Sequence, residues 1–176
     1  METIGAIFLQ TAIKRLFYYK ELGDKTFAQL NDADFNYRPN LASNSIAIII
    51  QHLSGNMLSR WTNFLTEDGE KEWRQRDAEF EPQTFTKEEL IGLWDKGWQC
   101  VYDAWSGLQE PDLLKTIAIR SESLSVADAM LRQLAHYPYH VGQIVYLGRE
   151  IKDQDWKSLS IPKGDSAAYN QQMNRK

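Results

Sequence analysis

The chain contains three histidines, His52, His136 and His140, whose spacing could bring three imidazoles to one metal ion. His136 and His140 are four residues apart, so on a helix their Cβ atoms lie on one face, about 5–6 Å apart. Imidazole nitrogens bind zinc and similar ions at about 2.0–2.1 Å, so two such rings can share one ion. His52 lies at the edge of an apolar row in a second predicted helix. If the two helices pack side by side, the three rings meet.

Three interior histidines without a metal are the alternative interpretation, and it has a physical requirement. Each buried neutral imidazole needs one partner for its ring N–H group and another for its lone pair. A shared metal ion would bind the lone pair, and nearby acceptors must then accept from the ring N–H group. Gln133, Gln143 and Asn56 are close enough along their helices to be those acceptors.

Three neutral ligands would leave a divalent ion its full charge and at least one open position, which is typical of catalytic rather than structural sites. Such an ion lowers the pKa of a bound water or thiol. The segment His136-Tyr-Pro-Tyr-His140 lacks the glutamate that follows the first histidine of a zincin helix, which argues against a metalloprotease of that type. Imidazole suits zinc, nickel, copper and iron alike, so the donors do not identify the metal.

Pro138 lies between the two histidines and removes one helical hydrogen bond, to the Leu134 carbonyl. We expect its ring to kink the helix at this point. The kink would either aim the two imidazoles at one ion or spoil their alignment, and the sequence leaves both outcomes open.

The hydrophobic period of amphipathic helices is found in four segments: residues 3–30, 45–66, 86–108 and 125–151. The third and fourth segments open with capping-box sequences, Thr86 with Glu89 and Ser125 with Asp128. Between them, residues 116–119 favour a short extended segment, and we expect a crossover with a small hairpin there.

These patterns predict an all-α fold, a four-helix bundle with long crossover connections. The bundle forms one domain over residues 1–151, and residues 152–176 form a polar C-terminal tail that is surface-bound or disordered. The loop over residues 70–85 is long for a compact domain and is therefore functional or mobile. Within it, Arg74 and Arg76 would either clamp a substrate carboxylate or, as we expect, remain solvated.

The composition excludes several classes of function. A net charge of −4 and a pI of about 5.4 give no basic face for nucleic acid and no polybasic patch for anionic lipid. The longest apolar stretch, Ile46 to Ile50, is too short to span a bilayer. Cys100 is the only cysteine, so no intrachain disulfide can form and a reducing, cytoplasmic location is expected.

The remaining reactive or aromatic residues are predicted to be structural. Cys100 is expected to be a small core filler rather than a nucleophile, because no histidine is left to act as its base. The large aromatic side chains favour the core or a dimer interface over a ligand-binding box; they are Trp61, Trp94, Trp98 and Trp105.

The histidine pattern resembles the DinB/YfiT-like superfamily over residues 3–151. The resemblance rests on His52-Leu53 in a second helix and His136-x-x-x-His140-Val-Gly-Gln-Ile144 in a fourth. The segment Gly69-Glu-Lys-Glu-Trp-Arg-Gln-Arg-Asp77 is similar to a bacterial branch whose function is not defined. Pro138 departs from the usual run between the two later histidines.

This resemblance implies a four-helix bundle, commonly a homodimer, with a divalent ion, nickel or zinc, on His52, His136 and His140. Members of the superfamily include S-transferases that activate a low-molecular-weight thiol such as bacillithiol, a mycothiol-dependent isomerase, and proteins described as metal-dependent hydrolases. We therefore expect a metal-dependent enzyme that transfers a low-molecular-weight thiol to a small-molecule electrophile. A metal-dependent hydrolase and a non-catalytic dimeric binding or stress-response module are the alternatives. No catalytic residue beyond the three ligands is assigned.

Overall fold

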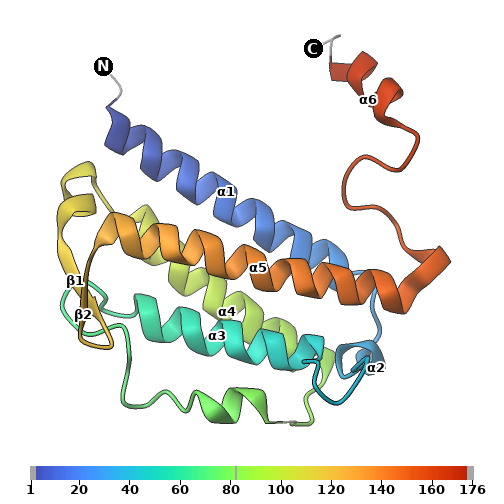
Figure 1. Cartoon of the computed structure of the whole chain (residues 1–176), viewed down its shortest axis with the longest axis horizontal. Coiled ribbons are helices and arrows are strands. Elements are labelled where there is room, and N and C mark those ends of the chain that lie inside the picture. Colours follow the sequence, from blue (N-terminus) through green and yellow to red (C-terminus); the bar gives the residue numbers. More distant parts are fainter. Residues whose placement is uncertain (1–2, 82, 174–176) are drawn as a thin grey trace.

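The computed structural model describes residues 3–81 and 83–173, and most of these residues are helical (Figure 1). Four helices are long: α1 (Ile4–Phe27), α3 (Ile46–Trp61), α4 (Lys87–Ser106) and α5 (Val126–Lys152). The short elements are α2 (Asp32–Phe35), α6 (Ser166–Met173), the 3-10 helices η1 (Asp77–Phe80), η2 (Glu110–Leu114) and η3 (Asp153–Asp155), and strands β1 (Thr116–Ile119) and β2 (Glu122–Ser125). The all-α expectation is therefore supported, with one small sheet added.

Each long helix begins at a hydroxyl side chain that accepts a hydrogen bond from the backbone N–H three residues further on; these residues are Thr3, Ser45, Thr86 and Ser125. The capping box predicted at Thr86 is confirmed, because the Glu89 carboxylate also accepts from the Thr86 N–H at 2.8 Å. Between Ser125 and Asp128 only the hydroxyl half of the predicted box is present.

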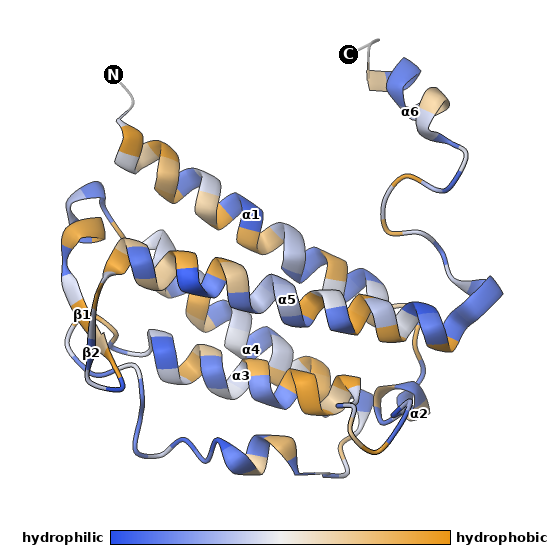
Figure 2. Cartoon of the chain, in the orientation of Figure 1, coloured by the Kyte–Doolittle hydropathy of each residue, from blue (hydrophilic) through white to orange (hydrophobic). Residues whose placement is uncertain are grey.

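The second long helix ends earlier than predicted, at Trp61 rather than near residue 66. Thr62 is extended, and Asn63 has a φ of 50°, in the left-handed region that asparagine tolerates better than most residues. The chain therefore leaves the helix axis several residues early. Figure 2 shows that α3 is most hydrophobic at its beginning and more polar toward this end.

A cluster of tryptophans fills the core where α4 packs against α3 and α1. Trp98 and Trp105 are fully buried, and Trp61 and Trp94 are at most 3% exposed. The rings of Trp94 and Trp98 lie 5.2 Å apart in an edge-to-face arrangement, as do those of Trp61 and Trp105. The core interpretation of these four residues is confirmed.

The connection from α3 to α4, residues 62–86, runs back along α3 instead of extending into solvent (Figure 1). The Ser59 hydroxyl donates to the Gly69 carbonyl at 2.7 Å, and the Arg60 guanidinium donates to the same oxygen. Arg74 is only 8% exposed, so the prediction of a solvated side chain was wrong there. It was right for Arg76, which is exposed.

The expected small hairpin is present between η2 and α5. Strands β1 and β2 pair antiparallel, and Arg120 and Ser121 form a two-residue turn with φ values of 56° and 63°. Positive φ at both positions is the geometry of a type I′ turn, which usually takes asparagine and glycine. Here the Asp68 carboxylate accepts from both backbone N–H groups at 2.8 Å, which offsets the strain. The hairpin is thereby joined to the connection after α3.

Beyond α5 the chain is hydrogen-bonded to Gln29, two residues after the end of α1. Gln29 accepts from the Lys157 N–H at 2.8 Å and donates to the Lys157 carbonyl at 3.1 Å. Farther on, α6 has no buried residue and lies away from the four long helices (Figure 1). The division of the chain at residue 151 stays a prediction. None of the helices described here is long and apolar enough to cross a membrane.

Candidate metal centre

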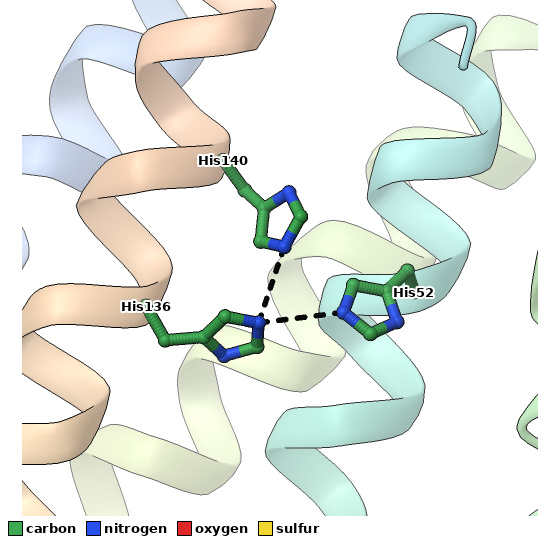
Figure 3. Close-up of side chains that lie close together, drawn as sticks. All are labelled: His52, His136 and His140. Carbon is green, nitrogen blue, oxygen red and sulfur yellow. Dashed lines mark hydrogen bonds between the residues drawn. The ribbon is translucent and has the colours of Figure 1, made fainter. Parts of the chain in front are cut away.

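The three histidines meet between α3 and α5. Helix α5 is continuous across Pro138, and it presents His136 and His140 from successive turns toward His52 on α3 (Figure 3). The Nε2 atom of His136 lies 3.1 Å from that of His140 and 3.4 Å from that of His52. One ligand atom from each ring lies within 4.8 Å of the other two, so the cluster could hold a metal ion. Nitrogen ligands of a tetrahedral ion are separated by about 3.3 Å when the bonds are about 2.05 Å.

The hydrogen-bond partners on the far side of each ring favour the tautomer that carries its proton on Nδ1. The Nδ1 atoms lie 3.0 to 3.2 Å from oxygens that only accept: Glu79 Oε2 for His52, Gln133 Oε1 for His136 and Gln143 Oε1 for His140. In the neutral rings each Nδ1 is therefore the donor, and each Nε2 lone pair points into the cluster. Three lone pairs facing one another repel unless a cation lies between them.

Two of the three predicted acceptors are confirmed, and one was wrong. Gln133 and Gln143 hold the α5 histidines as expected. Asn56 instead accepts from the Tyr137 hydroxyl at 3.2 Å, and that hydroxyl accepts from the Trp61 indole at 3.0 Å. Asn56 therefore anchors α5 to α3 in the core, one turn of α3 beyond the ring of His52.

The site favours neutral imidazoles on α5. The pKa of His136 is lowered to about 3, chiefly by burial and then by the neighbouring His140 and His52. Burial also lowers the pKa of His140, His52 lowers it further, and the hydrogen bond with Gln143 partly opposes both. Neutral imidazole is the form that binds metal, so near pH 7 no proton has to leave these two rings before an ion enters.

Glu79 is the functional residue that the sequence did not indicate. It lies in η1, and its carboxylate joins His52 to Arg74, whose Nε and Nη2 lie 2.7 and 2.9 Å from its two oxygens. Burial would raise the pKa of Glu79, but the hydrogen bonds from His52 and Arg74 outweigh it and lower the pKa. Gly55 makes this approach possible, because a Cβ there would collide with Glu79 Oε1. The only available signal was the unusual length of the loop.

A cavity of about 380 Å³ opens onto the cluster. The three histidines line it together with Asn56, Phe80, Gln133 and five arginines: Arg60, Arg74, Arg76, Arg120 and Arg132. Phe80 lies against the His52 ring, with 4.9 Å between the ring centroids.

Cys100 does not contribute to this cavity. It packs partly buried against the core, and its sulfur contacts the Thr62 hydroxyl and the Met57 carbonyl at 3.8 and 3.9 Å. Burial is the main cause that raises the pKa of its thiol. The interpretation of Cys100 as a packing residue agrees with these contacts, because a raised pKa is the opposite of an activated nucleophile.

Comparison with known proteins gives a family but no characterised relative. Residues 3–165 match the model of a family described as "Protein of unknown function (DUF1572)". No curated protein matches the chain, and no solved structure matches it either. Because the match covers nearly the whole sequence, the chain belongs to this family of unknown function.

Proposed function

We propose that this protein is a metal-dependent enzyme with a DinB/YfiT-like four-helix bundle, which transfers a low-molecular-weight thiol to a small-molecule electrophile. His52, His136 and His140 would hold one divalent ion, nickel or zinc. One observation carries the proposal: the three Nε2 atoms converge while all three Nδ1 atoms face acceptors. A homodimer and a cytoplasmic location, where such thiols are kept reduced, complete the proposal.

The residues around the cluster orient the three imidazoles for metal binding. Glu79, Gln133 and Gln143 hold the three rings in the tautomer that presents Nε2, and carboxylate or amide partners of this kind raise the basicity of a ligand histidine. A bound divalent ion would lower the pKa of a coordinated thiol, so that its sulfur is ionised near neutral pH. In the transfer, the thiol proton passes to solvent and sulfur forms a bond to the electrophilic carbon. From an alkyl halide the leaving group departs with the electrons of the broken bond. In an epoxide or an activated alkene those electrons stay on the product, which takes up a proton.

Two features favour thiol transfer over hydrolysis. Within the part of the chain that the structure describes, no aspartate or glutamate lines the cavity, so a general base for attacking water is missing from its wall. Both oxygens of Glu79 are already bound, to Arg74 and to the outer nitrogen of His52. Since Cys100 lies elsewhere, a sulfur nucleophile has to come from a second substrate.

Metal content is the first test. Tag-free protein, His52→Ala and His140→Ala are loaded with nickel or zinc, desalted and measured by mass spectrometry. We expect about one equivalent in the parent, none in either variant, and full occupancy in Cys100→Ala, the control that removes the only thiol of the chain. Absence of metal from the loaded parent would overturn the proposal.

Thiol binding and conjugation are then measured on the metal-loaded protein, with a panel of alkyl halides, epoxides and activated alkenes. Conjugation that requires both thiol and His52 supports the transferase. A loaded protein that binds no thiol and conjugates none of these electrophiles would leave the non-catalytic binding module as the better interpretation.

A further inference from the structure

The cavity over the histidine cluster concentrates positive charge in a chain whose net charge is −4. Five of the nine arginines in the sequence line it, and they come from four separate segments: Arg60 from α3, Arg74 and Arg76 from the connection after α3, Arg120 from the hairpin turn and Arg132 from α5. No lysine and no acidic residue of the described ranges lines the same wall. A concentration of guanidinium groups alone points to oxyanions such as carboxylates and phosphates, because the paired N–H donors of arginine can bind two oxygens of such a group.

Carboxylates outside the cavity neutralise these arginines incompletely. Arg60 and Arg120 share a single partner, Glu70, whose Oε2 lies 2.9 Å from both. The carboxylate partners of Arg76 and Arg132 are themselves exposed: Asp77 lies 3.7 Å from Arg76, and Glu122 lies 3.2 Å from Arg132. Exposed pairs of this kind contribute only about 0–1 kcal/mol, so Arg76 and Arg132 can turn toward a ligand at little cost.

Arg74 lines the cavity and has a donor group without a hydrogen-bond partner in the described residues. Its side chain is only 1% exposed, and Glu79 takes its Nε and Nη2 groups. Its third nitrogen, Nη1, is buried and has no hydrogen-bond partner in residues 3–81 and 83–173. A buried donor without a partner costs about 1–3 kcal/mol, more when it is charged. Arg74 therefore brings to the wall of the cavity a charged group whose hydrogen-bonding capacity the described residues do not fully use.

The backbone of the hairpin turn holds Arg120 in a strained conformation at the wall of this cavity. Arg120 and Ser121 are held in the left-handed region, which costs a non-glycine residue about 1 kcal/mol or more. Asp68 holds both N–H groups, and Glu70 binds the Arg120 guanidinium. The connection after α3 thus fixes both the turn and the side chain that the turn carries to the cavity wall.

We propose that this arginine-lined cavity binds an oxyanion, a carboxylate or a phosphate, carried by the substrate of the histidine centre. The inference rests on the proposed function, because it names the chemical class of that enzyme's substrate: an anionic thiol or an anionic electrophile. A cavity of about 380 Å³ is within the range of small-molecule sites, and it fits one small anion with its reactive end at the histidines.

The test is calorimetric titration with two probes, inorganic phosphate and malonate, so that the phosphate and carboxylate sources are distinguished. Each is titrated into chelator-treated protein and into nickel-loaded protein. We expect one equivalent of at least one probe to bind, and the dissociation constant to rise about tenfold or more in Arg76→Gln and Arg132→Gln. Both side chains are about half exposed, so the variants should fold. Arg149→Gln, an exposed change on the same helix as Arg132, is the matched control and should bind as the parent does.

The outcomes separate this inference from the metal proposal. Binding to chelator-treated protein that weakens in Arg132→Gln supports the anion site even if the protein never takes up metal. Protein that holds nickel on its histidines but binds neither probe overturns the anion site and leaves the metal proposal standing. Equal weakening in Arg149→Gln would show an effect of overall charge and would also overturn the site.

Discussion

Two neighbouring rows of α3 are buried in different ways. Of the 16 residues in this helix, 14 are buried. One row, Leu53, Met57 and Trp61, faces the core and the tryptophans of α4. The row beside it, His52, Asn56 and Arg60, lines the cavity. The two rows are displaced by one residue in sequence, which is about 100° around the helix.

The two rows also depend on different parts of the molecule. The apolar row is stabilised by burial against other helices, which is non-directional and scales with the area removed from water. The polar row needs a specific partner for each buried donor and acceptor. For His52 and Arg60 these partners are Glu79 and the Gly69 carbonyl, and both lie in the connection after α3. Helix packing therefore specifies the apolar face of α3, whereas two of the three residues on the polar face depend on a loop.

Replacing adjacent residues of the two rows should have the largest and most distinct effects. Leu53 is fully buried, so Leu53→Ala should lower the free energy of unfolding by about 2–5 kcal/mol through lost burial and a residual cavity. The folded fraction should still take up one equivalent of metal. His52→Ala, one residue earlier, should abolish metal uptake. Urea unfolding followed by circular dichroism, with metal analysis of the folded protein, measures both. Metal loss in Leu53→Ala would mean that the rows are not independent.

Glu79→Gln isolates the contribution of the loop to the polar row, because it changes a partner of His52 without removing a metal ligand. The change removes the charge that orients His52 and pairs with Arg74, and losing such a partner weakens metal affinity about 10–100-fold. Competition with a chromophoric chelator gives the dissociation constant. Glu67→Gln is the matched control, because Glu67 lies in the same connection and pairs with Lys71 but contacts no histidine. Equal affinities in the two variants would contradict a supporting role for Glu79.

The same division between the apolar and the polar row decides what could be predicted from the sequence. The four long helices, their first residues and the tryptophan core follow from periodicity and capping, which are local signals. The convergence of His136 with His140 follows from their spacing on one helix, and Gln133 and Gln143 are three residues from the rings they hold. Glu79 and the buried state of Arg74 depend on how a 25-residue connection, residues 62–86, folds back over Gly55. No periodicity encodes that path, so this half of the site required the structure.

The smallest effect that we expect is a loss of folding stability in mild acid. It comes from the histidines of the cluster and not from the apolar row. His136 and His140 have lowered pKa values in the folded protein, so they stay neutral there while the unfolded chain takes up protons below about pH 6.5. Protons then favour the unfolded state, and stability falls with pH from about 6.5 toward the folded value of about 3 for His136. The slope is at most about 1.4 kcal/mol per pH unit for each proton, and less here because both rings are partly exposed.

Urea unfolding of chelator-treated protein at pH 7.5, 6.5, 5.5 and 5.0 tests this slope. These values lie above the range in which Glu79 would become protonated, since its pKa is lowered below its ordinary value. His136→Gln should show a shallower slope, because one of the two groups is gone. Leu53→Ala should keep the parent's slope at a lower overall stability, since the apolar row binds no protons. A parent protein whose stability is flat from pH 7.5 to 5.0 would mean that the histidine rings titrate normally. The cluster would then be an open, hydrated site rather than a desolvated one prepared for a cation.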